Sequence, residues 1–128
     1  MPDGLVEAAR AVRQRAYAPY SRFLVGAALE AEDGSVFVGC NVENASYSVT
    51  LCAERGALAA AVCAGARRFR RVAIVTDSEP PTPPCGACRQ ALAEFGDQLE
   101  VVSVGSKRVV HWTIRELLPD AFTSEHLA

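Results

Sequence analysis

Hydrophobic and polar positions follow two different periods along the first part of the chain. Apolar residues recur at helical spacing over residues 2–16, with Asp3 placed to cap the helix. Residues 23–31 are rich in strand-forming side chains and end at an Asp-Gly pair, which is a hairpin turn signal. We therefore predict a helix, then a strand that returns over residues 35–39, and then a polar loop over residues 41–50.

The rest of the chain repeats the alternation of helices and strands. Residues 51–65 are Ala-rich and apolar almost all round, which predicts a helix buried on most sides. Residues 71–76 form a short apolar strand pattern, and residues 78–84 contain four prolines and must be loop. The remaining predicted elements are a helix over residues 86–95, strands over residues 99–104 and 108–112, and a short helix opened by a capping box at residues 113–116.

This order of elements predicts one sheet with helices on both faces. The last two strands are separated by only three residues, so we expect them to pair as an antiparallel hairpin. The third and fourth strands are joined through a helix, so that pair can be parallel and right-handed. With 128 residues, the chain suits one compact domain over residues 1–128.

Composition narrows the function classes. Half of the residues are hydrophobic and 22% are charged, which is typical of a globular protein. A net charge of −2 gives no reason to expect nucleic acid as a partner. Charged residues interrupt the first helix, and the longest apolar run, near residues 57–66, is too short to cross a bilayer. We therefore expect a cytoplasmic protein with no membrane partner.

The five cysteines favour metal binding or burial over disulfides, because five is an odd number and we expect no export signal. Three of them cluster in motifs. Cys40 follows a predicted strand and Cys63 lies within a predicted helix, so we interpret both as buried small hydrophobes.

The clustered cysteines lie where two predicted helices begin. Cys85 and Cys88 are three residues apart at one helix start, and Cys52 lies at another. Three protein ligands leave a fourth tetrahedral position for water, as in a catalytic Zn²⁺ site. Glu54, two residues after a ligand, can move protons beside that position. Arg55 can offset the charge of a thiolate.

A lone C-x-x-C motif has several interpretations, including a redox pair, half of a structural zinc site or two buried thiols. The earlier C-x-E segment and Pro84 complete the established order C-x-E…P-C-x-x-C of zinc nucleobase deaminases, which favours catalytic zinc. The alternative is a structural zinc with a fourth ligand. His111 and His126 are the only histidines, and His111 fits an ordinary core or surface position in a strand.

At this level of detail the sequence resembles the small homotetrameric cytidine deaminases, from Tyr17 to about Phe122. The matching blocks are PYSRF (19–23), VGAAL (25–29), GCNVENASY (39–47), CAER (52–55), PCGACRQ (84–90) and LLP (117–119). The resemblance implies an α/β fold, a three-layer α/β/α sandwich with a five-stranded mixed sheet. It also implies zinc-dependent hydrolysis of cytidine and 2′-deoxycytidine to uridine and 2′-deoxyuridine, with release of ammonia, in pyrimidine salvage.

The resemblance also implies roles for individual residues. Asn41 and Glu43 match residues that hold the ribose 3′-hydroxyl, although alone they would suggest a surface loop with an Asx turn. Phe23 matches a residue packed on the pyrimidine, although its periodicity alone suggests a core strand residue. Phe122 resembles a residue that enters a neighbouring subunit's site, and Tyr47 one near the ribose at a subunit contact.

Arg55 and Gln90 are expected to lie next to the metal ligands and to support them without binding the metal. The expected chemistry has Glu54 deprotonating the attacking water and protonating N3 and the leaving amine. The resemblance also implies that the backbone carbonyl near Pro84 accepts hydrogen bonds from the amine hydrogens.

Two positions depart from the family pattern. Pro83 stands where a serine is common, so the loop should be stiffer and any hydroxyl contact there is lost. Gly56 stands where a larger residue is usual, and a glycine inside a helix costs about 1 kcal/mol relative to alanine. We expect Gly56 to allow close packing at a subunit contact.

Three other functions remain open at this stage. A deaminase of another cytosine compound, such as blasticidin S, would share the metal motif but differ around residues 41–47. A non-catalytic zinc-stabilised binding module would have four ligands and would not depend on Glu54. A polynucleotide deaminase would need a basic stripe to follow phosphates, which this chain lacks.

Overall fold

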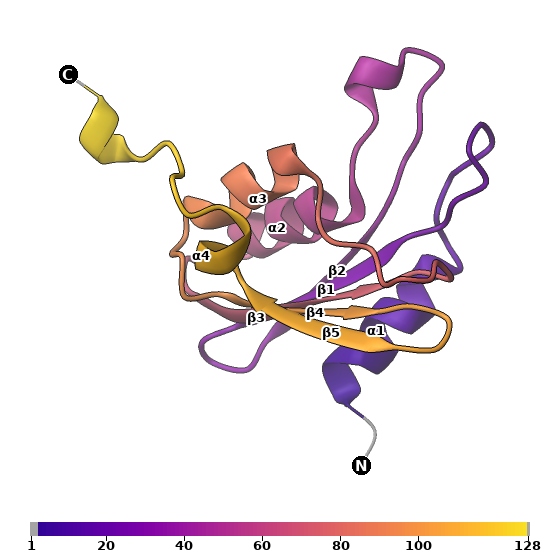
Figure 1. Ribbon diagram of the computed structural model, residues 1–128, viewed down its shortest axis with the longest axis horizontal. Helices are drawn as coiled ribbons and strands as arrows, with labels where there is room; N and C mark the ends of the chain where they lie inside the picture. Colours follow the sequence, from indigo (N-terminus) through magenta and orange to yellow (C-terminus); the bar gives the residue numbers. More distant parts are fainter. Residues whose placement is uncertain (1–2, 128) are drawn as a thin grey trace.

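The computed structural model describes residues 3–127 and is built on one five-stranded sheet (Figure 1). Its strands stand in the order β2-β1-β3-β4-β5. They are β1 (Gly26–Ala31), β2 (Val36–Cys40), β3 (Phe69–Val75), β4 (Glu100–Val104) and β5 (Val109–Thr113). All five strands that the sequence pattern predicts are present.

The pairing follows the predicted hairpins and crossover. β1 pairs with β2 and β4 with β5 in antiparallel fashion, whereas β3 and β4 are parallel. β1 also pairs with β3 in antiparallel fashion, from Gly26 opposite Val75 to Ala31 opposite Phe69. This pairing joins the two parts of the sheet into one mixed sheet.

Helix α1 (Gly4–Arg13) covers one face of the sheet. The predicted cap is confirmed, since Asp3 accepts a hydrogen bond from the Leu5 amide at 3.0 Å. Residue 2 of the predicted helix lies outside the described residues. The core under α1 contains only aliphatic side chains, namely Leu5, Val6, Ala9, Ala28, Ala73, Val75, Val102 and Val104.

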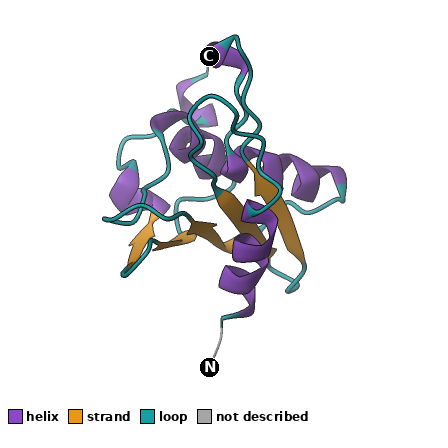
Figure 2. Ribbon diagram, turned by 90° about the vertical axis from the view of Figure 1, so that its right-hand side faces the viewer, coloured by secondary structure: helices purple, strands orange, loops and turns teal. Residues whose placement is uncertain are grey.

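Helices α2 (Ala53–Cys63) and α3 (Gly86–Ala93) lie on the opposite face (Figure 2). Their core includes Leu29, Leu58, Ile74 and Leu92, all nearly inaccessible. The three-layer α/β/α sandwich that the resemblance implies is therefore confirmed. A side chain at Gly39 of β2 would place its Cβ 2.4 Å from the Ala53 carbonyl oxygen, so α2 rests directly on the backbone of β2.

The first predicted strand is too long at its start. β1 begins at Gly26 rather than at residue 23, because the side chain of Asn41 takes the place of a neighbouring strand. Its Nδ2 donates to the Phe23 carbonyl at 2.8 Å, and its Oδ1 accepts from the Val25 amide at 2.9 Å. Residues 23–25 therefore form an extended segment held by side chains.

Two expectations about burial were wrong. α2 is not buried on most sides, because Ala59, Ala60 and Cys63 are exposed along its outer face. Cys63 ends the helix rather than lying within it, and Cys40, the last residue of β2, is only partly buried. The physical reason is that one side of α2 meets the sheet and α3, whereas none of residues 3–127 covers Ala59, Ala60 and Cys63 on the other.

The C-terminal part follows the prediction at its start. α4 (Ile114–Leu117) is opened by the predicted capping box between Thr113 and Glu116. His111 lies exposed on β5, as an ordinary surface residue. Two short 3₁₀ turns complete the fold, η1 (Tyr47–Val49) and η2 (Ser124–His126). Among residues 3–127, no helix is long and apolar enough to span a membrane.

Candidate metal and substrate site

Three cysteines from two helix starts meet at one point. Cys52 is the N-cap of α2, Cys85 is the N-cap of α3, and Cys88 lies in the first turn of α3. Their sulfur atoms all lie within 4.8 Å of one another, and those of Cys52 and Cys85 are 3.8 Å apart. Cys88 is fully buried, whereas Cys85 is exposed. This cluster is suited to holding a metal ion.

The surroundings of the cluster favour a thiolate at Cys52. Neither N-cap cysteine uses its side chain to cap its helix, so both helix starts retain partial positive charge near the sulfurs. A hydrogen bond from Cys88 lowers the pKa of Cys52 to about 5, and a further bond from Arg55 acts in the same direction. Arg55 Nη2 donates to Cys52 Sγ at 3.5 Å. Hydrogen bonding to Cys52 and burial raise the pKa of Cys88.

Glu54 lies beside the cysteines in the first turn of α2. It is 5% exposed, and this burial raises the pKa of its carboxyl to about 7. The negative charge of Cys52 raises the same pKa. A carboxyl group whose pKa is near neutrality can both accept and release a proton at physiological pH.

A cavity of about 230 Å³ opens over Glu54, Cys52 and Cys85. It brings together residues from five separate parts of the chain. Its wall is formed by Phe23, Val25, Asn41, Thr50, Cys52, Ala53, Glu54, Ile74, Thr82, Pro83 and Cys85. The sequence-predicted Phe23, Asn41, Cys52, Glu54 and Cys85 therefore share one pocket.

Glu43 lies outside that pocket, in an adjoining cavity of about 380 Å³. Thr50 lines both cavities. The Glu43 carboxylate accepts hydrogen bonds from the amides of Tyr20 and Ser21, at 3.0 and 3.1 Å, and from the Ser21 hydroxyl. The hydrogen bond from the Ser21 hydroxyl is the main reason that the pKa of Glu43 lies below its ordinary value.

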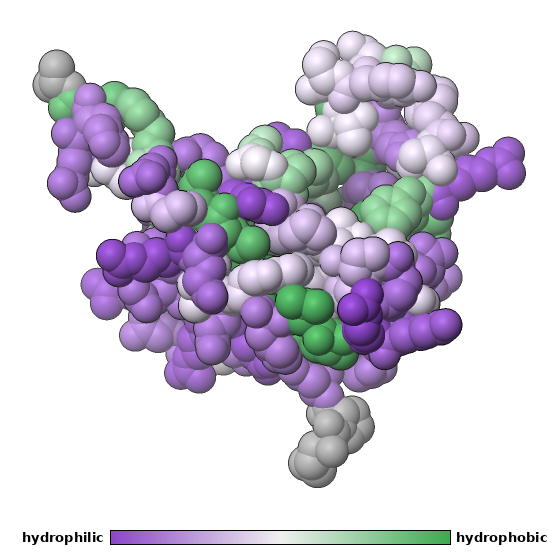
Figure 3. All heavy atoms as spheres, viewed as in Figure 1, coloured by the Kyte–Doolittle hydropathy of each residue, from purple (hydrophilic) through white to green (hydrophobic). Residues whose placement is uncertain are grey.

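Tyr47 lines the same second cavity and is 74% exposed. Its ring packs edge-on against Tyr20, with centroids 6.1 Å apart. The loop around η1 projects from the body of the molecule (Figure 1). Its side chains are of intermediate hydropathy, whereas strongly hydrophilic side chains dominate the lower part of the same face (Figure 3).

Phe122 and Gln90 lie apart from both cavities. Phe122 is 59% exposed and stacks on His126. The Gln90 side chain donates to the Phe122 carbonyl at 2.7 Å and accepts from its amide at 3.2 Å. Gln90 therefore holds the C-terminal segment on α3, and neither residue lines the cavity over Glu54.

Two residues that form or support the pocket, Thr82 and Arg89, carry no signal of their own in the sequence. Thr82 lies in the proline-rich loop, which the pattern predicts only as a loop. Arg89 also went unnoticed: it donates to the carbonyls of Pro84 at 2.8 Å and Leu117 at 2.9 Å and so fixes the segment before Cys85. Thr82 lies two residues before Pro84 and Arg89 directly after Cys88, and this closeness to the cysteine motif is the only clue that the sequence offers.

Comparison with known proteins identifies the site's relatives. Residues 3–104 match the model of the cytidine and deoxycytidylate deaminase zinc-binding region. A cytidine deaminase from Sporosarcina psychrophila is 47% identical over 98% of this chain and 94% of that protein. The crystal structure of a cytidine deaminase from Burkholderia pseudomallei covers 95% of this chain and all of its own, with 52% identity and a TM-score of 0.90.

A more distant relative bears on the substrate. A blasticidin-S deaminase from Bacillus cereus is 29% identical over 77% of this chain and 76% of that protein. The metal motif alone therefore does not separate the two kinds of enzyme, but identity and coverage are both higher for the cytidine deaminases. By sequence and by structure, the chain belongs to the cytidine and deoxycytidylate deaminase zinc-binding family.

Proposed function

We propose that this protein hydrolyses cytidine and 2′-deoxycytidine to uridine and 2′-deoxyuridine and releases ammonia, as an enzyme of pyrimidine salvage. The observation that carries the proposal is a cluster of three cysteine sulfurs, two of which, those of Cys52 and Cys85, belong to residues that line one cavity together with the buried Glu54. The cytidine deaminases that match nearly the whole chain support this substrate class.

The donor set fits zinc. Three sulfur ligands, Cys52, Cys85 and Cys88, with two helix starts and Arg55 to balance their charge, suit a tetrahedral site with one open position. Zinc bound there lowers the pKa of a water molecule in that position. In this proposal the positive charge of Arg55 offsets part of the negative charge of the three thiolates.

Glu54 moves the protons. Its carboxylate takes a proton from the water that attacks C4 of the pyrimidine and passes it to N3. It then takes the proton of the resulting C4 hydroxyl and passes it to the amino group, so that the C4–N bond breaks, ammonia leaves and the C4 carbonyl of the product forms. The pKa near 7 suits both directions of transfer. Phe23 packs against the pyrimidine ring from the opposite wall.

A backbone carbonyl in the proline-rich loop accepts the hydrogens of the amino group. The carbonyls of Thr82 and Pro84 already accept hydrogen bonds from Ser103 and Arg89, at 2.6 and 2.8 Å. Pro83 lies between them and lines the pocket, so its carbonyl is the better candidate of the three.

The ribose lies in the adjoining cavity. The Glu43 carboxylate has about four lone-pair sites and receives three protein hydrogen bonds, so one site on Oε2 is available for the 3′-hydroxyl. Asn41 uses one N–H and one lone pair to hold residues 23–25 and can offer the others. Tyr47 lies beside the same cavity.

The proposal includes a homotetramer in the cytoplasm. Phe122 is exposed and lies apart from this chain's own pocket, which suits a side chain offered to a neighbouring subunit. The exposed outer face of α2 and Tyr47 supply apolar surface for such contacts. Five free cysteines suit a reducing compartment. Light scattering of the purified protein measures the subunit number.

The test is turnover followed by ultraviolet absorbance with cytidine, 2′-deoxycytidine and blasticidin S, together with the zinc content of the same sample. We expect rapid loss of the cytosine absorbance with both nucleosides and about one zinc per chain. Faster turnover of blasticidin S would assign the protein to the alternative substrate. No absorbance change with any of the three compounds would refute the proposed function.

A further inference from the structure

The pocket has two opposing walls that lie outside the regular sheet. One wall consists of Phe23, Val25 and Asn41, and the other includes Thr82 and Pro83. Residues 23–25 precede β1, and residues 82–83 belong to the proline-rich loop after β3. Because neither wall is part of a strand, other contacts must hold them at the spacing that a flat pyrimidine ring requires.

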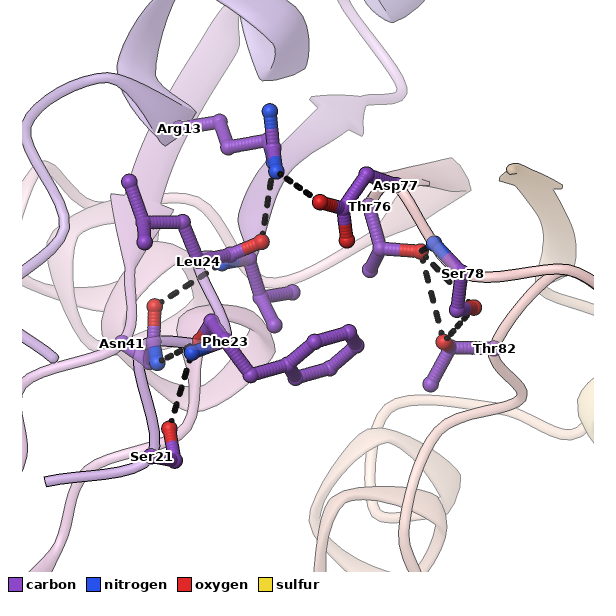
Figure 4. A network of polar contacts seen from close by, with 10 residues as sticks. Arg13, Ser21, Phe23, Leu24, Asn41, Thr76, Asp77, Ser78 and Thr82 are labelled. Atoms are coloured by element: carbon purple, nitrogen blue, oxygen red, sulfur yellow. Dashed lines mark hydrogen bonds and ion pairs between the residues drawn. The ribbon is translucent and has the colours of Figure 1, made fainter. Parts of the chain in front are cut away.

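Arg13, in the last turn of α1, reaches the backs of both walls (Figure 4). Its Nε donates to the Leu24 carbonyl at 2.9 Å, between the two lining residues Phe23 and Val25. Its Nη2 lies 3.5 Å from Asp77 Oδ2, at the start of the loop that forms the other wall. Arg13 itself does not line the pocket.

Arg13 is well placed to fix a distance, because its backbone lies directly against the start of β1. A Cβ at Gly26 would lie 2.0 Å from the Ala9 carbonyl oxygen and 2.8 Å from Arg13 Cβ, so α1 packs directly on the start of β1. The Arg13 side chain is 19% exposed. A charged donor with little solvent contact holds a carbonyl more firmly than an exposed one.

A cluster of hydroxyl groups continues from Asp77 to the second wall (Figure 4). Thr76, which is 3% exposed, lies 3.1 Å from the Ser78 hydroxyl and 3.3 Å from the Thr82 hydroxyl. The hydroxyls of Ser78 and Thr82 are 2.6 Å apart. Thr82 is thus fixed to the end of β3, next to the residue that Arg13 contacts.

We propose that Arg13 is a positioning residue that sets the separation of the two pocket walls and thereby the affinity for the pyrimidine. Arg13 acts on the first wall through Leu24 and on the second through Asp77 and the Thr76–Ser78–Thr82 hydroxyls. It touches neither the substrate nor the metal ligands. This inference rests on the proposed deamination of cytidine.

The test compares Arg13→Met with Arg10→Met, a change of the same kind one turn earlier at an exposed position of α1. For Arg13→Met we expect the KM for cytidine to rise on the order of tenfold, as one charge-assisted hydrogen bond is lost. The zinc content should not change, and kcat should stay within about threefold. Arg10→Met should leave all three quantities as in the wild type. A purely structural role for Arg13 would lower the melting temperature without changing KM.

Two further variants keep the test decisive if Arg13→Met does not fold. Asp77→Asn changes a side chain that is 71% exposed, and Arg13→Lys keeps the charge but loses the two-pronged reach. Both should raise KM, by less than Arg13→Met. An unchanged KM in both would overturn the inference, as would an unchanged KM in a folded Arg13→Met.

A double-mutant cycle tests whether the two walls are coupled. Thr82→Val removes the hydroxyl and nearly preserves the shape of the side chain. In the double variant with Arg13→Met, the fold-increase in KM should be smaller than the product of the fold-increases of the two single variants, because both substitutions weaken the same network. A fold-increase equal to that product would show that the two substitutions act independently and would refute the proposed coupling. A wild-type protein without turnover of cytidine would instead refute the proposed function itself.

Discussion

The two faces of the sheet use the same kinds of core residue but begin their helices differently. On the α1 face, Asp3 caps the helix with its carboxylate and is paired with Arg71, whose Nη1 and Nη2 lie 2.7 and 3.0 Å from its two oxygens. On the opposite face, Cys52 and Cys85 occupy the N-cap positions of α2 and α3 without capping them. One face completes its polar contacts internally, whereas the other leaves its helix starts available to a ligand.

The difference extends to the charged residues. The Arg71 guanidinium lowers the pKa of Asp3, so that carboxylate stays ionised and paired. Glu54, in the corresponding first turn of α2, is buried with a pKa raised to about 7. Stability and reactivity therefore place opposite demands on a carboxylate at a helix start, and this fold meets the two demands on opposite faces of one sheet.

The largest effect should come from removing a metal ligand. In Cys88→Ser, a hydroxyl replaces a fully buried thiol and cannot supply a thiolate, so the zinc content should fall from about one per chain to near zero and turnover should be lost. Elemental analysis and the absorbance assay measure both. Cys63→Ser is the matched control, because that cysteine is exposed at the other end of α2. Retention of zinc and activity by Cys88→Ser would contradict the assigned ligand set.

Removal of the proposed proton carrier should be the next largest effect. Glu54→Ala should lower kcat by about 10²–10⁴-fold while zinc content and melting temperature remain near those of the wild type. The control is Glu30→Ala, which removes a partly buried glutamate that contacts Arg71 beside α1. If Glu54→Ala retained a substantial fraction of the activity, the role assigned to Glu54 would be wrong.

A smaller effect tests how closely α2 approaches the sheet. Gly39→Ala would place a methyl group 2.4 Å from backbone atoms of α2, so we expect a loss of about 3 kcal/mol in the free energy of unfolding. At Gly56 the nearest atom to an added Cβ is a Leu51 side-chain carbon at 3.6 Å. Gly56→Ala should therefore be tolerated by the single chain and serves as the control. Denaturant unfolding measures both, and equal destabilisation would contradict the described packing.

The smallest effect concerns the paired carboxylate on the α1 face. Asp3→Asn keeps an oxygen that can cap α1 but loses the charge that pairs with Arg71, so stability at pH 7 should fall by about 1 kcal/mol. Because the folded pKa lies below the ordinary value of 3.8, this contribution is present above pH 3.8 and disappears as the pH falls through the folded pKa.

The measurement for Asp3→Asn is the melting temperature as a function of pH, with Glu7→Gln as the control. Glu7 forms an exposed pair with Arg10, at 3.4 Å, and its loss should change little. A difference between Asp3→Asn and the wild type that stays constant from pH 7 down through the folded pKa of Asp3 would show that the ion pair is not its cause.

Local patterns were sufficient for most of the secondary structure. The hairpin at Asp33-Gly34, the capping box at Thr113 and the proline-rich loop each depend on neighbours within a few residues, and the structure has all three. The start of β1 was predicted wrongly because Asn41, sixteen or more residues away, bonds the backbone of residues 23–25. The exposure of Cys63 was missed because a helix pattern does not reveal which of its faces lacks a partner.

The sequence by itself determined the metal chemistry and the order of the strands and helices along the chain. Thiol ligands, a nearby carboxylate and a turn signal are short-range properties, which the residue types and their spacing express directly. The tertiary structure alone decided how Cys52, thirty-three residues from Cys85, comes within 3.8 Å of it. It also decided that Arg13 lies behind the pocket, that Thr82 lines the pocket and that Glu43 lies in a second cavity. These arrangements depend on long-range packing of α1 and α2 against β1 and β2, which no local pattern encodes.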